Sequence, residues 1–226
     1  MRLLKLSCAL LFLTTLAAVG PAFADSNPVS MNFLSVGGNN GGGVYTYPYN
    51  FSVNGGPSTP LICDTFDNEV APGETWKATT SSLMSDAGLF QSKSNSQLDY
   101  EAAGLIFQGI VSGKINPTVG NWAIWALFSQ NAYNNSYFTS SGANLIYNQY
   151  LGIAAGDSQS QITSLLGDIV VYTPIAGSQS AGFGTPQEYF GIQVPEAGST
   201  AMLGIAFLAI AGGVWKKHQI APGSQS

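Results

Sequence analysis

Charged residues are scarce in this sequence: Asp, Glu, Lys and Arg together make up 8% of its 226 residues, where a typical globular protein has about 25%. Eleven of the twelve carboxylates lie between Asp25 and Pro195, and the only cations there are Lys77, Lys93 and Lys114. A nucleic-acid-binding domain needs a basic surface, so this composition excludes a nucleic-acid partner. Hydrophobic residues still reach 45%, which predicts a folded domain rather than disorder.

Histidine and cysteine are rarer still. The one histidine, His218, lies close to the C-terminus, and of the two cysteines Cys8 belongs to an N-terminal apolar segment. Residues 25–193 therefore cannot hold a Ser-His-Asp triad, a Cys-His pair or a histidine-ligated metal. Cys63 has no cysteine partner for an intramolecular disulfide or a cysteine-rich zinc site. We expect a protein without enzymatic activity, cofactor or metal.

The N-terminus has the arrangement of a secretory signal peptide. Arg2 and Lys5 form a short basic region, residues 6–19 are apolar, and the small-x-small sequence 22–24 precedes Asp25. This order of segments predicts cleavage after residue 24 and export of the chain. The alternative is a short uncleaved anchor, although the apolar run is short for a membrane span.

A second apolar segment, residues 197–215, lies near the C-terminus and contains no charged residue. As a helix it would be about 28 Å long, close to the hydrocarbon thickness of a bilayer. Lys216 and Lys217 follow directly, and cations beside a span favour the cytoplasmic side. The predicted topology is an extracytoplasmic domain, one transmembrane helix and a short cytoplasmic tail, residues 219–226.

The residues around this segment resemble the PEP-CTERM sorting signal, a three-part tail that exosortases process in Gram-negative bacteria with exopolysaccharide-rich envelopes. The resemblance covers residues 194–218, and its motif positions are Val194, Pro195, Glu196, Gly198, Ser199, Lys216 and Lys217. It departs from the commonest form at Ala197, where a second proline is usual. The resemblance implies an exosortase as partner, anchoring in the inner membrane before processing, and a final place at the cell surface or outside the cell. The exopolysaccharide matrix is a candidate partner there.

Pro195 also has a physical meaning of its own. It cannot continue a helix backwards and it biases Val194 toward an extended conformation, so a protease at the membrane surface would meet an extended segment. The alternative is a C-terminal anchor that is never cut, because the topology alone is compatible with both.

The region between the two terminal segments, residues 25–193, reads as strands, then helices, then strands. This order favours an α+β fold, which we expect to be a β-rich sandwich or barrel-like domain with an inserted helical subdomain, followed by the single C-terminal transmembrane helix. The patterns predict strands at 44–53, 60–66, 74–80, 169–173 and 188–194, and helices at 98–110, 122–128, 146–153 and 162–166.

Cys63 and Asn121 carry a second, more distant resemblance. Cys63 precedes Asp64, and Asn121 opens the sequence Asn-Trp-Ala-Ile-Trp, which looks like the thioester domains of bacterial surface adhesins. In those domains a strand cysteine is bonded to a glutamine in a Thr-Gln-x-Ala-Ile-Trp motif. Here Gly120 and Asn121 occupy the threonine and glutamine positions. The resemblance implies a covalent adhesin with a Cys63–Asn121 thioester. The plainer alternatives are a buried inert thiol and an asparagine that caps the helix beginning at Trp122.

Two further groups of residues suggest binding. Asp64, Asp67 and Glu69 could offer oxygens to calcium, but their spacing matches no known loop, and we expect a solvated strand end. Tyr45, Tyr47 and Tyr49 alternate along one predicted strand and so would share a face. That row could bind carbohydrate, although packing within the sheet is the expectation. The leading interpretation is thus a non-enzymatic exported envelope protein, with a covalent adhesin and a carbohydrate-binding module as alternatives.

Overall fold

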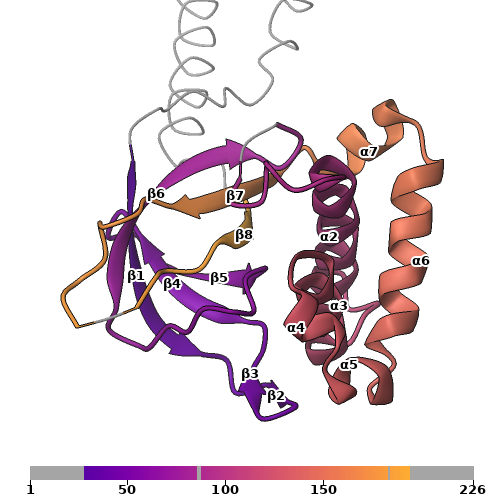
Figure 1. Ribbon diagram of the computed structural model, residues 1–226. Coiled ribbons are helices and arrows are strands. Elements are labelled where there is room, and N and C mark those ends of the chain that lie inside the picture. Colours follow the sequence, from indigo (N-terminus) through magenta and orange to yellow (C-terminus); the bar gives the residue numbers. More distant parts are fainter. Residues whose placement is uncertain (1–27, 86–87, 183, 194–226) are drawn as a thin grey trace, which may run out of the picture. The chain divides into compact units, whose positions relative to one another are not determined.

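The structure is a computed structural model that describes residues 28–85, 88–182 and 184–193. These residues form a closed barrel of six strands with a group of helices packed on one side of it (Figure 1). The barrel strands are β1 (Val29–Val36), β4 (Tyr49–Val53), β5 (Ser58–Cys63), β6 (Thr75–Ser82), β7 (Ile169–Pro174) and β8 (Tyr189–Ile192), and their order around the barrel is β1-β4-β5-β8-β7-β6. Every neighbouring pair is antiparallel.

All the helices of the described residues are inserted between β6 and β7, two strands that are neighbours in the barrel. They are α2 (Ser96–Val111), α3 (Pro117–Phe128), α4 (Gln130–Tyr133), α5 (Ser136–Ser140), α6 (Ala143–Gly156) and α7 (Gln159–Leu166). The expected α+β class, the barrel-like domain and the inserted helical subdomain are therefore confirmed. The described residues contain no helix that is both long and apolar enough to span a bilayer, and the predicted transmembrane helix 197–215 lies outside them.

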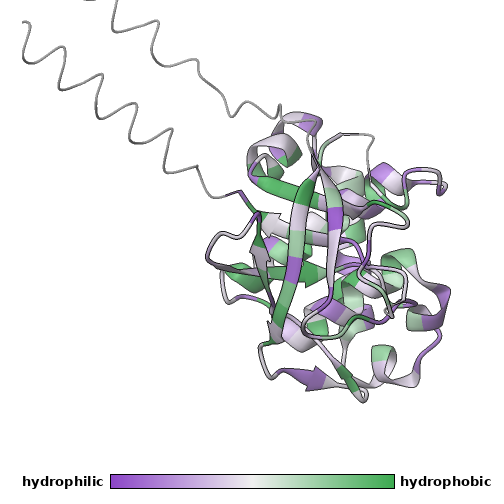
Figure 2. Cartoon of the chain, turned by 90° about the vertical axis from the view of Figure 1, so that its left-hand side faces the viewer, coloured by the Kyte–Doolittle hydropathy of each residue, from purple (hydrophilic) through white to green (hydrophobic). Residues whose placement is uncertain are grey.

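The barrel interior is filled by side chains that alternate along the strands, as a closed sheet requires. Phe51 lies at its centre: its ring contacts those of Phe33, Trp76 and Tyr189, with ring centroids 4.6 to 5.4 Å apart. All four side chains are buried. In Figure 2, which faces the barrel, hydrophobic and hydrophilic segments alternate along the strands.

A second core lies between the barrel and the helices. Consecutive residues of β5 show how the two cores meet, because Leu61 and Cys63 point into the barrel whereas Ile62 packs in the cluster that holds the helices. All three are buried, as expected for a strand that is covered on both faces. Helix α3 is buried on all sides from Gly120 to Phe128, which confirms the prediction of a buried helix there.

The predicted strand 44–53 is two separate elements. Val44–Tyr45 is strand β3, which pairs with β2 (Asn40–Gly41) in a small hairpin outside the barrel, and Tyr49–Val53 is barrel strand β4. Pro48 lies between them, and a proline cannot donate the main-chain hydrogen bond that a continuous strand would need. The hairpin packs on α3, where the Trp122 indole N–H donates to the Gly41 carbonyl at 3.1 Å.

Candidate functional site

Cys63 is the last residue of β5, and its thiol is completely buried in the barrel core. The chain turns back over the sulfur, so that the Thr65 N–H donates to Sγ at 3.3 Å and the thiol donates to the Thr65 carbonyl at 3.2 Å. Both hydrogen-bonding partners of the thiol thus come from the main chain two residues later. The position agrees with the interpretation of Cys63 as a buried thiol on a strand.

Burial raises the pKa of the Cys63 thiol well above its ordinary value, and the neighbouring carboxyl of Asp64 raises it further. The Thr65 N–H and the Trp125 indole N–H act in the opposite direction and lower this pKa by smaller amounts. The thiol is therefore held protonated, and a protonated thiol is a weak nucleophile.

Asn121 lies inside helix α3, and the prediction that it caps a helix is wrong. The helix begins four residues earlier, at Pro117, and its N-cap is Asn116, whose side chain accepts from the main-chain N–H groups of Thr118 and Val119. The prediction placed the helix start at Trp122 because the continuous apolar run begins there. Asn116-Pro117 is the actual start signal, with a capping asparagine followed by proline at the first helical position.

The Asn121 amide instead forms hydrogen bonds that connect helix α3 to two parts of the β structure. Its Nδ2 donates to the Cys63 carbonyl at 2.9 Å, and its Oδ1 accepts from the Tyr47 N–H at 2.8 Å. The side chain is fully buried. The structure therefore brings the two residues of the predicted thioester together, but the hydrogen bond that joins them ends on the main-chain oxygen of Cys63 and not on its sulfur.

Asp64 and Glu188 form a buried pair of carboxyl groups that the sequence reading did not identify. Glu188 accepts three hydrogen bonds, from the Tyr100 hydroxyl, from the Thr173 hydroxyl and from the Leu89 N–H at 2.6 Å. Both carboxyl groups are fully buried. The pair links the ends of two barrel strands to helix α2, which carries Tyr100.

Asp64 is a carboxyl group with a raised pKa. Burial raises its pKa well above the ordinary value, and the charge of Glu188 and a hydrogen bond to Glu188 raise it further. Asp64 Oδ2 has no hydrogen-bond partner among the described residues. Its other oxygen accepts from the Thr65 hydroxyl at 2.9 Å.

The prediction that Asp64, Asp67 and Glu69 form a solvated strand end is therefore wrong for Asp64. Asp67 and Glu69 are exposed, and Asp67 accepts from the Asn131 amide at 2.7 Å, but Asp64 turns inward because its strand is covered on both faces. Within residues 28–85, 88–182 and 184–193, no three His, Cys, Asp or Glu side chains come close enough together to hold a metal ion.

The three tyrosines that were expected to share a strand face do not do so. Tyr45 is 56% exposed on the β2–β3 hairpin, Tyr47 is half-buried against helix α2, where its ring meets Phe107, and Tyr49 is buried inside the barrel. The interruption at Pro48 is the reason, because it ends the alternation on which the prediction depended. A carbohydrate site built on this row is excluded.

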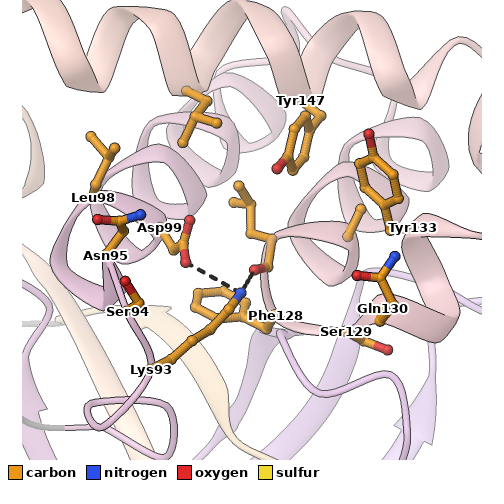
Figure 3. Close-up of a pocket in the computed structure, with 13 residues that line it drawn as sticks. Lys93, Ser94, Asn95, Leu98, Asp99, Phe128, Ser129, Gln130, Tyr133 and Tyr147 are labelled. Carbon is orange, nitrogen blue, oxygen red and sulfur yellow. Dashed lines mark hydrogen bonds and ion pairs between the residues drawn. The ribbon is translucent and has the colours of Figure 1, made fainter.

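A hollow of about 500 Å³ lies among the start of α2, the end of α3 and one side of α6 (Figure 3). At its floor Lys93 is held in place by three contacts. Its Nζ lies 3.3 Å from Asp99 Oδ2, donates to the Leu127 carbonyl, and lies 5.6 Å from the centroid of the Phe128 ring. The sequence did not predict that these residues meet, since the segments that carry them come together only in the folded domain.

The residues of the predicted sorting signal, 194–218, lie outside the described part of the chain, as do the signal peptide 1–24 and the tail 219–226. The predicted motif positions Val194, Pro195, Glu196, Gly198, Ser199, Lys216 and Lys217 therefore stay predictions.

Comparison with known proteins adds one likeness of fold. No protein-family model and no curated protein matches the sequence. Among solved structures, the chain is similar to the N-terminal domain of the Streptococcus pyogenes pilus tip adhesin Cpa, with 13% sequence identity and a TM-score of 0.37. The alignment covers 78% of this chain and 98% of that domain.

Proposed function

We propose that this protein is an exported envelope protein without enzymatic activity, which an exosortase sorts through its C-terminal segment. The observation that carries the proposal is the order of segments in the sequence: a basic and apolar N-terminus, a folded domain, Val194-Pro195-Glu196, an uncharged apolar run, and Lys216-Lys217. Each segment has a role in export, anchoring or cleavage. The exopolysaccharide matrix is the proposed destination.

The folded domain supports a role in binding rather than catalysis. Its barrel is packed with aromatic side chains such as Phe51 and Trp76, so the interior is a core and not a substrate cavity. Cys63 is the strongest potential nucleophile in the described residues, and its thiol is buried with a raised pKa. Contacts with other molecules would therefore be made by the outer surface of the helices and loops.

The intact mass of the protein recovered from its native cells tests the proposal. We expect a species that begins at Asp25 and ends near Pro195 or Glu196, because the signal peptide and the apolar tail would both be removed. A Pro195→Ala, Glu196→Ala double variant should keep the tail, and a Pro186→Ala variant, changed outside the motif, should be processed normally. A wild-type mass that still includes residues 197–215 would contradict the proposal.

A second candidate function, a covalent adhesin, is favoured by one observation: the Asn121 amide lies within hydrogen-bonding distance of Cys63. In this reaction Cys63 Sγ would bond to Asn121 Cγ, the Cγ–Nδ2 bond would break, and the amide nitrogen would leave as ammonia with the thiol proton. Both hydrogen bonds of the Asn121 amide group would have to rearrange.

The thioester changes both mass and thiol reactivity. The adhesin hypothesis expects a mass deficit of one ammonia in the wild type, and no such deficit in Asn121→Ala. An Asn116→Ala variant removes an asparagine from the same helix without touching Cys63, so the deficit should persist in it. A full-mass protein whose Cys63 reacts stoichiometrically with a thiol reagent after unfolding would rule out the thioester.

A further inference from the structure

The hollow among α2, α3 and α6 has the size of a small-molecule site. Its volume of about 500 Å³ lies within the range of about 300 to 1,000 Å³ that is usual for ligand pockets. The helices that form it are well fixed, because α2 and α3 pack on the barrel and α6 packs on both of them. The hollow is thus part of a preformed surface.

The charges inside the hollow cancel. Lys93 and Asp99 form its only ion pair within the described residues, and Lys93 is also bound to the end of α3 through the Leu127 carbonyl. The Lys93 ammonium group is therefore already engaged by protein groups and is not positioned to bind a ligand. A site with no uncompensated charge gives no advantage to an ionic ligand.

The walls combine aromatic rings with uncharged polar groups. In Figure 3 the Tyr147 hydroxyl points into the hollow, and the Tyr133 ring stands beside it. The two rings meet edge to face with centroids 5.7 Å apart, and Tyr133 is 46% exposed. Gln130 projects from the same side, and its amide donates to Asn134 at 3.0 Å, which fixes its orientation.

Asn95 contributes the second amide, and its conformation is unusual. It is the N-cap of α2, yet its side chain makes no capping hydrogen bond, and its backbone is left-handed with φ 65°. Asparagine adopts the left-handed backbone conformation more readily than most residues, but glycine adopts it at least as readily. The Asn95 side chain is thus used neither for the helix start nor, in the described structure, for any other hydrogen bond, and it borders the hollow.

We propose that this hollow binds a neutral saccharide unit. A sugar ring offers an apolar C–H face to an aromatic side chain and hydroxyl groups to amides and to a tyrosine hydroxyl, and it carries no charge. Tyr133 supplies the aromatic surface, Asn95, Gln130 and Tyr147 supply the polar contacts, and the Lys93–Asp99 pair forms a neutral floor. The choice of a polysaccharide as the source of the sugar rests on the proposed function, because an envelope protein in such a matrix meets this ligand continuously.

Calorimetric titration of the full chain tests the site, in a zwitterionic detergent that has no sugar head group. The neutral probes are maltotriose, cellotriose and tri-N-acetylchitotriose, and the acidic probe is trigalacturonate. We expect at least one neutral probe to bind. Tyr133→Ala, which removes the stacking ring, should weaken this binding by about tenfold or more.

Two matched pairs of variants locate the site. Asn95→Gly removes the amide but keeps the left-handed backbone, and it should also weaken binding, whereas Asn54→Gly makes the same change at another left-handed asparagine (φ 51°) in the β4–β5 turn and should not. Tyr45→Ala, on the hairpin that contacts the opposite end of α3, controls for Tyr133→Ala. Equal binding by all variants, preference for trigalacturonate, or no binding of any probe would overturn the proposal. The mass test of export is unaffected by each of these outcomes.

Discussion

The interior of the barrel and the layer between barrel and helices are both buried, but they are built from different chemistry. The core inside the barrel consists of apolar and aromatic side chains, together with the thiol of Cys63. The layer between barrel and helices contains Asn121, Asp64, Glu188 and Tyr100, whose hydrogen bonds join the two halves. The barrel is thus stabilised mainly by the area that it buries, whereas a few directional contacts determine where the helices dock.

The largest effect should come from the barrel core. Trp76→Ala would remove a buried ring that packs on Phe51 and Tyr189, and we expect it to cost about 3 to 5 kcal/mol of unfolding free energy. Urea unfolding followed by circular dichroism measures this loss. The exposed Tyr45→Ala variant should change the unfolding free energy by no more than about 0.5 kcal/mol. A cost below about 1 kcal/mol for Trp76→Ala would show that the barrel is not the main source of stability.

The second-largest effect on stability should come from the interface between the barrel and the helices. Asn121→Ala leaves the Tyr47 N–H and the Cys63 carbonyl without partners in a buried place, so we expect a loss of about 2 to 4 kcal/mol. Asn116→Ala, which removes only the exposed cap of the same helix, should cost about 1 kcal/mol. The same urea titrations compare the two, and equal losses would contradict the fastening role of Asn121.

The carboxyl pair makes the interface sensitive to pH. The pKa of Asp64 is raised in the folded state, so folding retains a proton there that the unfolded chain releases. This contribution to stability is complete below the ordinary pKa of an aspartate and is lost as pH rises through the raised pKa of Asp64. The unfolding free energy then falls by at most about 1.4 kcal/mol per pH unit.

Asp64→Asn separates this contribution from that of other groups. The amide can donate to Glu188 without titrating, so the variant should lose the pH slope that belongs to Asp64 and should be more stable than the wild type at neutral and higher pH. Glu74 and Asp99 also have raised pKa values, and the difference between variant and wild type cancels their effect. Asp67→Asn, at an exposed position, is the control. An unchanged slope in Asp64→Asn would show that Asp64 is not the source of this pH dependence.

The smallest effect should come from the Lys93–Asp99 pair, since the lysine side chain is 40% exposed. Burial raises the pKa of Asp99, and the neighbouring Lys93 lowers it only partly, so the charged pair contributes little net stability. We expect Asp99→Asn to change the unfolding free energy by less than about 1 kcal/mol. Thermal unfolding measures this change, and a loss comparable with that of Asn121→Ala would place this pair among the contacts that fix the helices.

Local patterns predicted much of the fold. The uniformly apolar sequence of α3 indicated a buried helix, and the order of strands and helices indicated the class. Strand β1 was not predicted, although Val29, Met31 and Phe33 alternate with polar residues in the way that a barrel strand requires.

The polar contacts of the interface could not be predicted in the same way. Asn121 meets Cys63 across 58 positions of sequence, and Asp64 meets Glu188 only because β5 and β8 are neighbours in the barrel. Local hydrophobic periodicity in the sequence does not predict such long-range contacts. One clue was present: Glu188 directly precedes the apolar residues Tyr189 and Phe190, and a carboxylate beside a buried strand needs donors of its own.

The place of β8 in the barrel has a consequence for how the chain folds. The last strand of the described residues lies between β5 and β7 and closes the ring. The two strands flanking the helices, β6 and β7, pair across the whole helical insertion. A chain that has emerged only as far as residue 188 therefore presents two open strand edges, which are templates for aggregation. If the C-terminal segment is cleaved as proposed above, cleavage after β8 has closed the ring would release a domain without these open edges.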